Sequence, residues 1–203
     1  MARKKTEEPK RPYELGKRLV QMDKSRADIL RAALDLLEAN GYRQLTMGSL
    51  AAESGVTRQT VHNLFGTKVG VLEALFDVIA LDGGMERMRE AMTQPMAEAM
   101  LKRFVEVICG FWASHRVLLR RIHGIGAIDP EFGLVIDARN KRRTIAATRI
   151  AGRFGTGGEV KQKIAVLTVL TSFEFFDGLV ENGVDEEAAA GIIFGLARDL
   201  FSK

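Results

Sequence analysis

The chain has 203 residues, of which 46% are hydrophobic and 28% are charged, and its formal net charge is +4. These proportions are typical of a globular protein of one or two domains and exclude a largely disordered chain. No apolar run reaches about 18 residues, so we expect no transmembrane helix. The single cysteine, Cys109, excludes a disulfide framework or a cysteine-based zinc cluster within one chain. We therefore expect a cytoplasmic protein.

The positive charge is unevenly distributed along the chain. Residues 1–31 carry ten Lys and Arg against five Asp and Glu, and residues 116–153 carry nine against three. The remaining residues are acidic as a group. Binding to a polyanion requires local charge rather than a large total, so the net value of +4 does not exclude it.

A first helix is predicted over about residues 25–40. Its apolar residues recur at the helical positions i, i+3, i+4, i+7 and i+8: Ile29, Ala32, Ala33, Leu36 and Leu37. Ser25 and Asp28 have the spacing of a capping box, and Gly41 is a stop signal. Three further helices are predicted after threonine caps at Thr46, Thr57 and Thr67.

Longer helices are predicted downstream. Pro95 and Pro130 each suit the first turn of a helix. Residues 159–182 are β-branched in part, but 24 residues exceed the length of about 4–8 of a strand, so one helix is predicted there. A final helix is predicted from Asp185. The chain is therefore predicted to be all-α, with about nine or ten helices.

The segment Leu45–Phe65 has the pattern of two short helices joined by a tight turn at Gly55. Apolar residues turn inward, which leaves polar side chains at or near the outward face of the second helix: Thr57, Arg58, Gln59, Thr60, His62 and Asn63. No Asp or Glu occurs between Ser54 and Leu72. Such a surface suits a phosphate-lined groove, although a plain helical hairpin with a solvated face has the same pattern.

The order and spacing of these residues resemble a known family. Ile29–Tyr42, Leu45–Met47, Ser54–Thr57 and the following residues to about 76 look like the N-terminal domain of TetR-family transcriptional regulators. The resemblance implies a homodimer in which each helix-turn-helix reads half of a near-palindromic operator. It also implies a repressor whose C-terminal domain binds a small-molecule ligand that causes release of the DNA, with activator action left open. The predicted domains are a basic flexible arm at 1–24, a three-helix DNA-binding domain at 25–70, and a helical ligand-binding and dimerisation domain at 71–203.

The outward face and the resemblance together predict a DNA-binding set: Thr46, Thr57, Arg58, Gln59, Thr60, His62, Asn63 and Lys68. By resemblance, Thr46 and Lys68 would contact phosphate, and Thr57 would cap the recognition helix. The family often has Tyr at the position of His62 and Gly at that of Gln59. Gln59 therefore either reads an adenine edge or faces solvent. The basic arm either contacts DNA or is a solubilising tail, partly folded at residues 13–22.

The C-terminal two-thirds contain methionines at helical spacing, followed by aromatic residues. Methionine lines adaptable apolar pockets but also fills ordinary cores. A pocket for a largely apolar effector is predicted from eight residues: Met88, Met92, Phe104, Ile108, Phe111, Trp112, His123 and Phe173. A dimer interface on the last two helices is predicted from seven residues: Phe173, Phe176, Val180, Ile192, Ile193, Leu196 and Leu200. The rival interpretation places these seven residues in an intramolecular core.

No cofactor, metal site, membrane partner or enzyme activity is expected. Cys109 with His115 or His123 is the one available nucleophile–base combination, and it lies in an apolar, helical stretch. Arg120 and Arg121 could bind an anionic group, or pair with nearby carboxylates. The basic run from Arg139 to Arg143 is interpreted as a solvated helix face, because consecutive residues point in different directions. A DNA-binding dimer without a small-molecule inducer remains an alternative.

Overall fold

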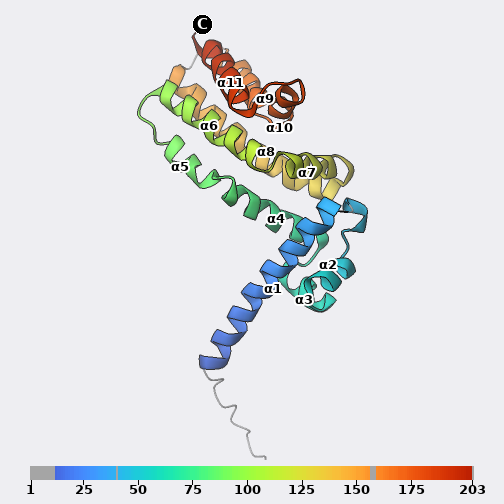
Figure 1. The fold of residues 1–203 in the computed structure, drawn as a ribbon. Helices are drawn as coiled ribbons and strands as arrows, with labels where there is room; N and C mark the ends of the chain where they lie inside the picture. Colours follow the sequence, from blue (N-terminus) through green and yellow to red (C-terminus); the bar gives the residue numbers. More distant parts are fainter. Residues whose placement is uncertain (1–11, 40, 156–158, 203) are drawn as a thin grey trace, which may run out of the picture. The chain divides into compact units, whose positions relative to one another are not determined.

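The computed structural model describes residues 12–39, 41–155 and 159–202, with the side chains from residue 24 onward. Within these ranges all regular structure is helical, with eleven α-helices and two short 3-10 helices (Figure 1). The predicted all-α fold is confirmed. The chain divides into two compact units, residues 1–71 and 72–203, called here the N-terminal and C-terminal units. No helix in the described part is long and apolar enough to cross a membrane.

The N-terminal unit is built from short helices packed on one long helix. Its elements are α1 (Pro12–Ala39), the 3-10 helix η1 (Tyr42–Gln44), α2 (Met47–Ser54), α3 (Arg58–Phe65) and the start of α4 (Lys68–Asp82). Helix α2 packs on both α1 and α3. Ile29, Leu50 and Val61 are completely buried where these helices meet. This small apolar core holds α3 against the unit by one face only, so its other face is exposed.

The first helix is longer than the sequence predicted. It begins at Pro12 rather than near residue 25, so residues 12–24 are helical. The prediction of a flexible arm is wrong for them, and the alternative of a folded segment at residues 13–22 is confirmed. The predicted capping box is also wrong, because Ser25 is buried within the helix. Proline is well suited to the first helical turn, and no other proline follows before residue 95 to stop the helix. The rest of the predicted arm, residues 1–11, lies outside the described residues.

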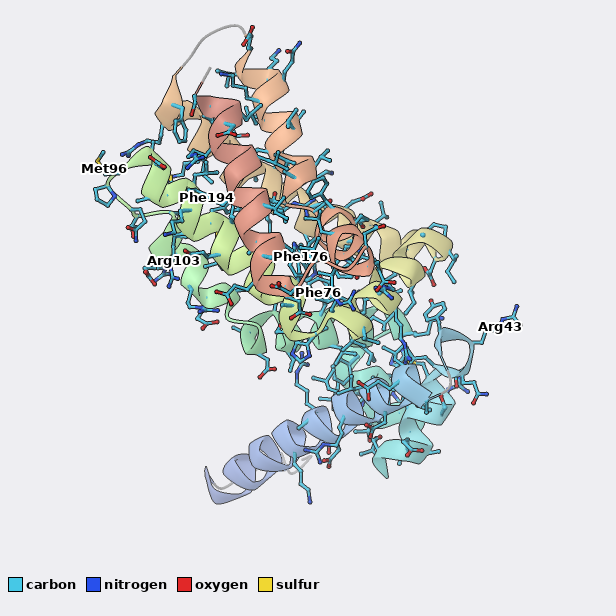
Figure 2. The ribbon with its side chains drawn as sticks, turned by 45° about the horizontal axis from the view of Figure 1, so that its top comes forward. Arg43, Phe76, Met96, Arg103, Phe176 and Phe194 are labelled. Atoms are coloured by element: carbon cyan, nitrogen blue, oxygen red, sulfur yellow. The ribbon has the colours of Figure 1, made fainter. Side chains whose placement is uncertain are left out.

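The C-terminal unit is a bundle of longer helices that continues from α4. Its elements are η2 (Met85–Arg87), α5 (Met88–Ala91), α6 (Ala97–Ser114), α7 (Arg116–Ile128), α8 (Pro130–Phe154), α9 (Val160–Leu170), α10 (Phe173–Glu181) and α11 (Glu186–Phe201). Helix α6 packs on α11, and α8 packs on both α7 and α9. Figure 2 shows Phe76 and Phe176 among the packed helices, whereas Met96 lies at an end. Phe76 and Phe176 are buried, whereas Met96 is exposed.

The single helix predicted over residues 159–182 is wrong, because the chain breaks between α9 and α10. Ser172 starts α10 as its cap, and its hydroxyl accepts a hydrogen bond from the Phe175 amide at 3.1 Å. The break leaves the Thr171 carbonyl outside the helical ladder. That buried oxygen accepts hydrogen bonds from Trp112 Nε1 and Arg143 Nη1, each at 3.1 Å. Side chains from α6 and α8 therefore stabilise a break that local sequence does not reveal.

Candidate DNA-binding surface and ligand cavity

The two helices of the motif are fixed by their caps and by one turn. Thr46 caps α2: its hydroxyl accepts a hydrogen bond from the Ser49 amide at 3.0 Å, and Ser49 Oγ accepts one from the Thr46 amide at 2.9 Å. Gly55 ends α2 with φ 70° and ψ 19°, a left-handed conformation that favours glycine. The predicted Thr46 cap and the Gly55 turn are confirmed. The angle at which α3 leaves α2 is therefore set locally.

Helix α3 presents a continuous polar face. Thr57 caps it by accepting a hydrogen bond from the Thr60 amide at 3.1 Å. Gln59 Nε2 donates to Asn63 Oδ1 at 2.8 Å, so these two amides lie one turn apart on the same face. Of the predicted set, Thr60 and Lys68 are half-buried and the other six are exposed: Thr46, Thr57, Arg58, Gln59, His62 and Asn63. The structure thus places six of the predicted residues on α3 or at its cap, whereas Thr46 caps α2 and Lys68 begins α4.

Cations beside this face rest on aromatic rings. Lys68 Nζ lies 3.7 Å from the centroid of the Tyr42 ring, and the Arg26 guanidinium lies 4.7 Å from that of Phe65. No ion pair is found among the described side chains of residues 24–71. A cation–π contact holds a side chain in place without cancelling its charge. These groups therefore stay available to an external anion such as a phosphate.

Comparison with known proteins identifies this part of the chain. Residues 29–75 match the family model described as "Bacterial regulatory proteins, tetR family". These residues form a TetR-family DNA-binding domain. A search of curated proteins found no match to the sequence.

Solved structures of transcriptional regulators, two of them described as TetR regulators, share the whole fold. A TetR transcription regulator from Haloarcula marismortui aligns with a TM-score of 0.66 at 15% identity, over 89% of this chain and 97% of its own. The TetR-family regulator PfmR from Thermus thermophilus aligns with a TM-score of 0.56 at 19% sequence identity, over 85% of this chain and 93% of its own. A candidate transcriptional regulator from Saccharomonospora viridis, solved with choline, aligns with a TM-score of 0.62 at 16% sequence identity, over 89% of this chain and 96% of its own. The C-terminal unit therefore belongs to the TetR-like fold.

The C-terminal unit contains a cavity of about 460 Å³. Its walls come from α4, η2, α5, α6, α7 and α8. Six residues of the predicted pocket line it: Met88, Phe104, Ile108, Phe111, Trp112 and His123. The ring centroids of Phe111 and Trp112 are 4.7 Å apart, and Phe76, which was not predicted, lies 5.9 Å from Phe111. This volume is in the usual range of about 300–1,000 Å³ for small-molecule sites.

Two predicted pocket residues do not line the cavity. Phe173 is buried behind the wall, where its ring contacts those of Trp112 and His123 at 5.6 and 4.7 Å. Met92 follows the short helix α5 and lies outside the lining. Phe173 begins α10 directly after the break in the predicted helix, and there it packs against the rings of Trp112 and His123.

Three arginines of α8 line the cavity: Arg139, Arg142 and Arg143. They lie at i, i+3 and i+4, so they share one side of the helix. Arg142 is exposed, but Arg139 and Arg143 are partly buried, so the interpretation of this basic run as a solvated helix face is wrong for these two. The i+4 spacing within the basic run was the signal that could have shown this face.

The predicted dimer set divides into buried and accessible residues. Phe173, Phe176 and Ile193 are buried inside the chain, so the prediction that they form an interface is wrong. They fill the core between α10, α11 and their neighbours. Val180 and Leu200 are half-buried, whereas Ile192 and Leu196 on α11 are 40% and 46% exposed. On α9, which packs against α11, Val166 and Val169 are 42% and 60% exposed.

Cys109, His115 and His123, the side chains that an enzyme would need, do not form a catalytic pair. Burial raises the pKa of the Cys109 thiol to about 12, which suppresses the nucleophilic thiolate. His115 Nε2 lies 2.7 Å from Asp82 Oδ2, and His123 Nδ1 lies 2.8 Å from Glu174 Oε1. Neither histidine is hydrogen-bonded to Cys109. The geometry gives no support to a Cys–His pair.

Proposed function

We propose that the protein is a homodimeric transcriptional regulator that binds a near-palindromic DNA operator through α3 and leaves it when a small molecule fills the cavity. The observation that carries the proposal is the exposed, acid-free face of α3 within a TetR-family domain. Thr57, Arg58 and Gln59 open this face at the helix N-terminus, where helix-turn-helix proteins contact base edges. The positive end of the helix dipole favours phosphate there.

Each predicted residue has a role that suits its position. Thr46 and Thr57 lie at helix starts, where their hydroxyls can donate to phosphate oxygens. Lys68, held over Tyr42, supplies a charge for the adjacent phosphate. Gln59 and Asn63 share a hydrogen bond, and either amide can pair with the N6 and N7 atoms of an adenine once that bond opens. Arg58 is the residue suited to a guanine edge or a phosphate.

Selection of bound fragments from a random pool of double-stranded DNA tests the proposal. Enrichment of two related half-sites, with centres about 34–36 Å or one helical turn apart or a multiple of this, is expected for a dimer. Enrichment of sites without two-fold symmetry would contradict the proposed dimer. No enrichment would contradict sequence-specific binding.

The dimer is proposed to form through exposed apolar residues of α9 and α11, with Val169, Ile192 and Leu196 at its centre. Light scattering should give twice the mass of the 22.4 kDa chain at micromolar concentration. The double change Ile192→Glu and Leu196→Glu should yield a folded monomer, because two carboxylates would be buried at a self-complementary contact. Leu134→Glu is the control, since Leu134 is 70% exposed on α8. A monomeric parent protein would contradict the proposed dimer.

Release of DNA by a ligand is supported by the size and apolar walls of the cavity. The related structure from Saccharomonospora viridis was solved with choline. A compound that binds the cavity should lower operator affinity, as measured by fluorescence anisotropy of labelled DNA. A regulator whose operator affinity is unchanged by every cavity ligand would instead be the inducer-independent dimer.

A further inference from the structure

The cavity of the C-terminal unit combines an aromatic wall with cationic groups on one helix. Phe76, Phe111 and Trp112 form a connected set of rings on one side. Arg139, Arg142 and Arg143 of α8 contribute the cations. The carboxylates of the lining are Asp77 and Glu86, and Glu86 is exposed. The ionic state of the two partly buried arginines therefore decides which ligand charge the cavity accepts.

Arg139 is already neutralised. Its Nη2 lies 2.8 Å from Asp77 Oδ1 and also donates to the Glu73 carbonyl at 3.2 Å. Its guanidinium lies 4.2 Å from the centroid of the Phe76 ring. Asp77 is thereby occupied as well. Neither member of this pair is a free charge for a ligand.

Arg143 is different. Its one hydrogen-bond partner among the described residues is the Thr171 carbonyl, at 3.1 Å from Nη1. Its Nε is buried and has no hydrogen-bond partner, as is also true of Arg139 Nε, but no carboxylate forms an ion pair with Arg143 among the described residues. Burial lowers the pKa of Arg143, and Glu174, whose negative charge acts in the opposite direction, is hydrogen-bonded to His123. An arginine remains charged even so, which leaves a partly buried cation without an ion pair.

We propose that the cavity binds an amphipathic carboxylate, with its apolar body against Phe76, Phe111 and Trp112 and its anionic head on Arg143. Once a small movement of the guanidinium brings the unpartnered Nε to the cavity surface, Nε and the neighbouring Nη2 can hold a carboxylate as a bidentate pair. This proposal deepens the proposed function, on which it depends only for the consequence of binding. A cationic ligand would place its charge near Arg143 while Asp77 is held by Arg139.

The same arginine connects the site to the helix break. Arg143 Nη1 supports the Thr171 carbonyl between α9 and α10, beside the hydrogen bond from Trp112. A carboxylate on Arg143 competes for this guanidinium. The ligand head is therefore coupled to the position where α9 meets α10.

Trp112 is the only tryptophan of the chain, so its fluorescence reports on this cavity directly. The probes are decanoate, decan-1-ol and decyltrimethylammonium. Each is titrated into the full-length protein below its solubility limit and, for the two ionic probes, below the critical micelle concentration. Decanoate is expected to bind at least about tenfold more tightly than decan-1-ol, because charge-assisted hydrogen bonds are roughly twice as strong as neutral ones. Equal affinities for decanoate and decan-1-ol, or tighter binding of decyltrimethylammonium, would overturn the proposal.

Variants locate the carboxylate. Arg143→Gln should reduce decanoate affinity at least about tenfold and leave decan-1-ol unchanged, and Arg143→Lys should retain part of the preference. Arg149→Gln is the matched control, because Arg149 is exposed on the same helix and lies outside the cavity lining. An undiminished decanoate preference in Arg143→Gln would refute the assignment. If Arg143→Gln does not fold, the comparison of the three probes on the unmodified protein still decides the ligand charge.

The two proposals fail separately. Decanoate that binds through Arg143 without changing operator affinity would retain the site and contradict ligand-induced release. Loss of operator binding caused by decan-1-ol or decyltrimethylammonium, with no binding of decanoate, would retain release and contradict the carboxylate.

Discussion

The two units use charged residues in opposite ways. Over the described side chains of residues 24–71 no ion pair is found, and Arg26 and Lys68 rest on aromatic rings. In the C-terminal unit, Arg116 and Arg120 of α7 both pair with Asp177 and Glu181. Arg116 and Arg120 of the second basic region are therefore neutralised within the fold, whereas Arg26 and Lys68 keep their charge. A surface that binds a polyanion has to keep its cations unpaired, while a bundle uses them to join its helices.

The largest expected effects come from substitutions in the two cores, each of which should abolish the activity of one unit. Val61 and Ile193 are completely buried, one in each unit. A carboxylate at either position should cost more than about 3 kcal/mol, because no partner is available for the buried charge. Val61→Asp should abolish operator binding and leave the Trp112 fluorescence response to decanoate intact, and Ile193→Asp should abolish that response. Loss of both activities in Val61→Asp would show that the units do not fold independently.

Removing positive charge at or beside α3 should weaken DNA binding and leave the domain folded. Arg58→Ala and Lys68→Ala are each expected to lower operator affinity about tenfold. Lys68→Ala should also reduce the slope of log affinity against log salt by about 1, since one phosphate contact is lost. Arg31→Ala, an exposed change on α1, is the charge-matched control. An equal loss in the control would indicate a general charge effect instead of these contacts.

Helix caps allow a finer comparison of the units. Thr57 caps α3, and Asp185 caps α11 by accepting a hydrogen bond from the Ala188 amide at 2.8 Å. Thr57→Ala and Asp185→Ala should each reduce the free energy of unfolding by about 1 kcal/mol. Operator affinity, measured by anisotropy, should fall in Thr57→Ala alone. Unchanged affinity would assign Thr57 a capping role and no contact with DNA.

The smallest expected effect is a pH dependence in the C-terminal unit. The hydrogen bond from His123 lowers the pKa of Glu174 to about 2, from an ordinary value near 4.5. The stabilisation is therefore present above about pH 4.5 and is lost as the pH falls toward 2. Glu174→Gln should cost about 1 kcal/mol or less at pH 7, because the carboxylate is largely exposed. Urea unfolding of Glu174→Gln should show a smaller loss of stability at pH 3 than at pH 7. The control Glu187→Gln, an exposed change on α11, should show no loss at either pH.

Local signals predicted the N-terminal motif well. The caps at Thr46 and Thr57 and the turn at Gly55 depend on residues within three or four positions of one another. The start of α1 was missed, because Ser25 and Asp28 imitate a cap within a helix that continues through them. The break between α9 and α10 was missed for another reason. The hydrogen bonds that satisfy Thr171 come from Trp112 and Arg143, 59 and 28 residues away.

The sequence by itself determined the all-α class, the helix-turn-helix and the polar face of α3, because each follows from periodicity and from short-range capping. The sequence also determined the uneven distribution of positive charge along the chain. Tertiary structure decided which charges are neutralised: Arg116 and Arg120 meet carboxylates about 60 residues away, Arg139 meets Asp77, and Arg143 meets a backbone carbonyl. Tertiary structure likewise buried Phe173, Phe176 and Ile193, which an apolar pattern alone cannot distinguish from an interface. Pairing and burial both depend on which helices become neighbours.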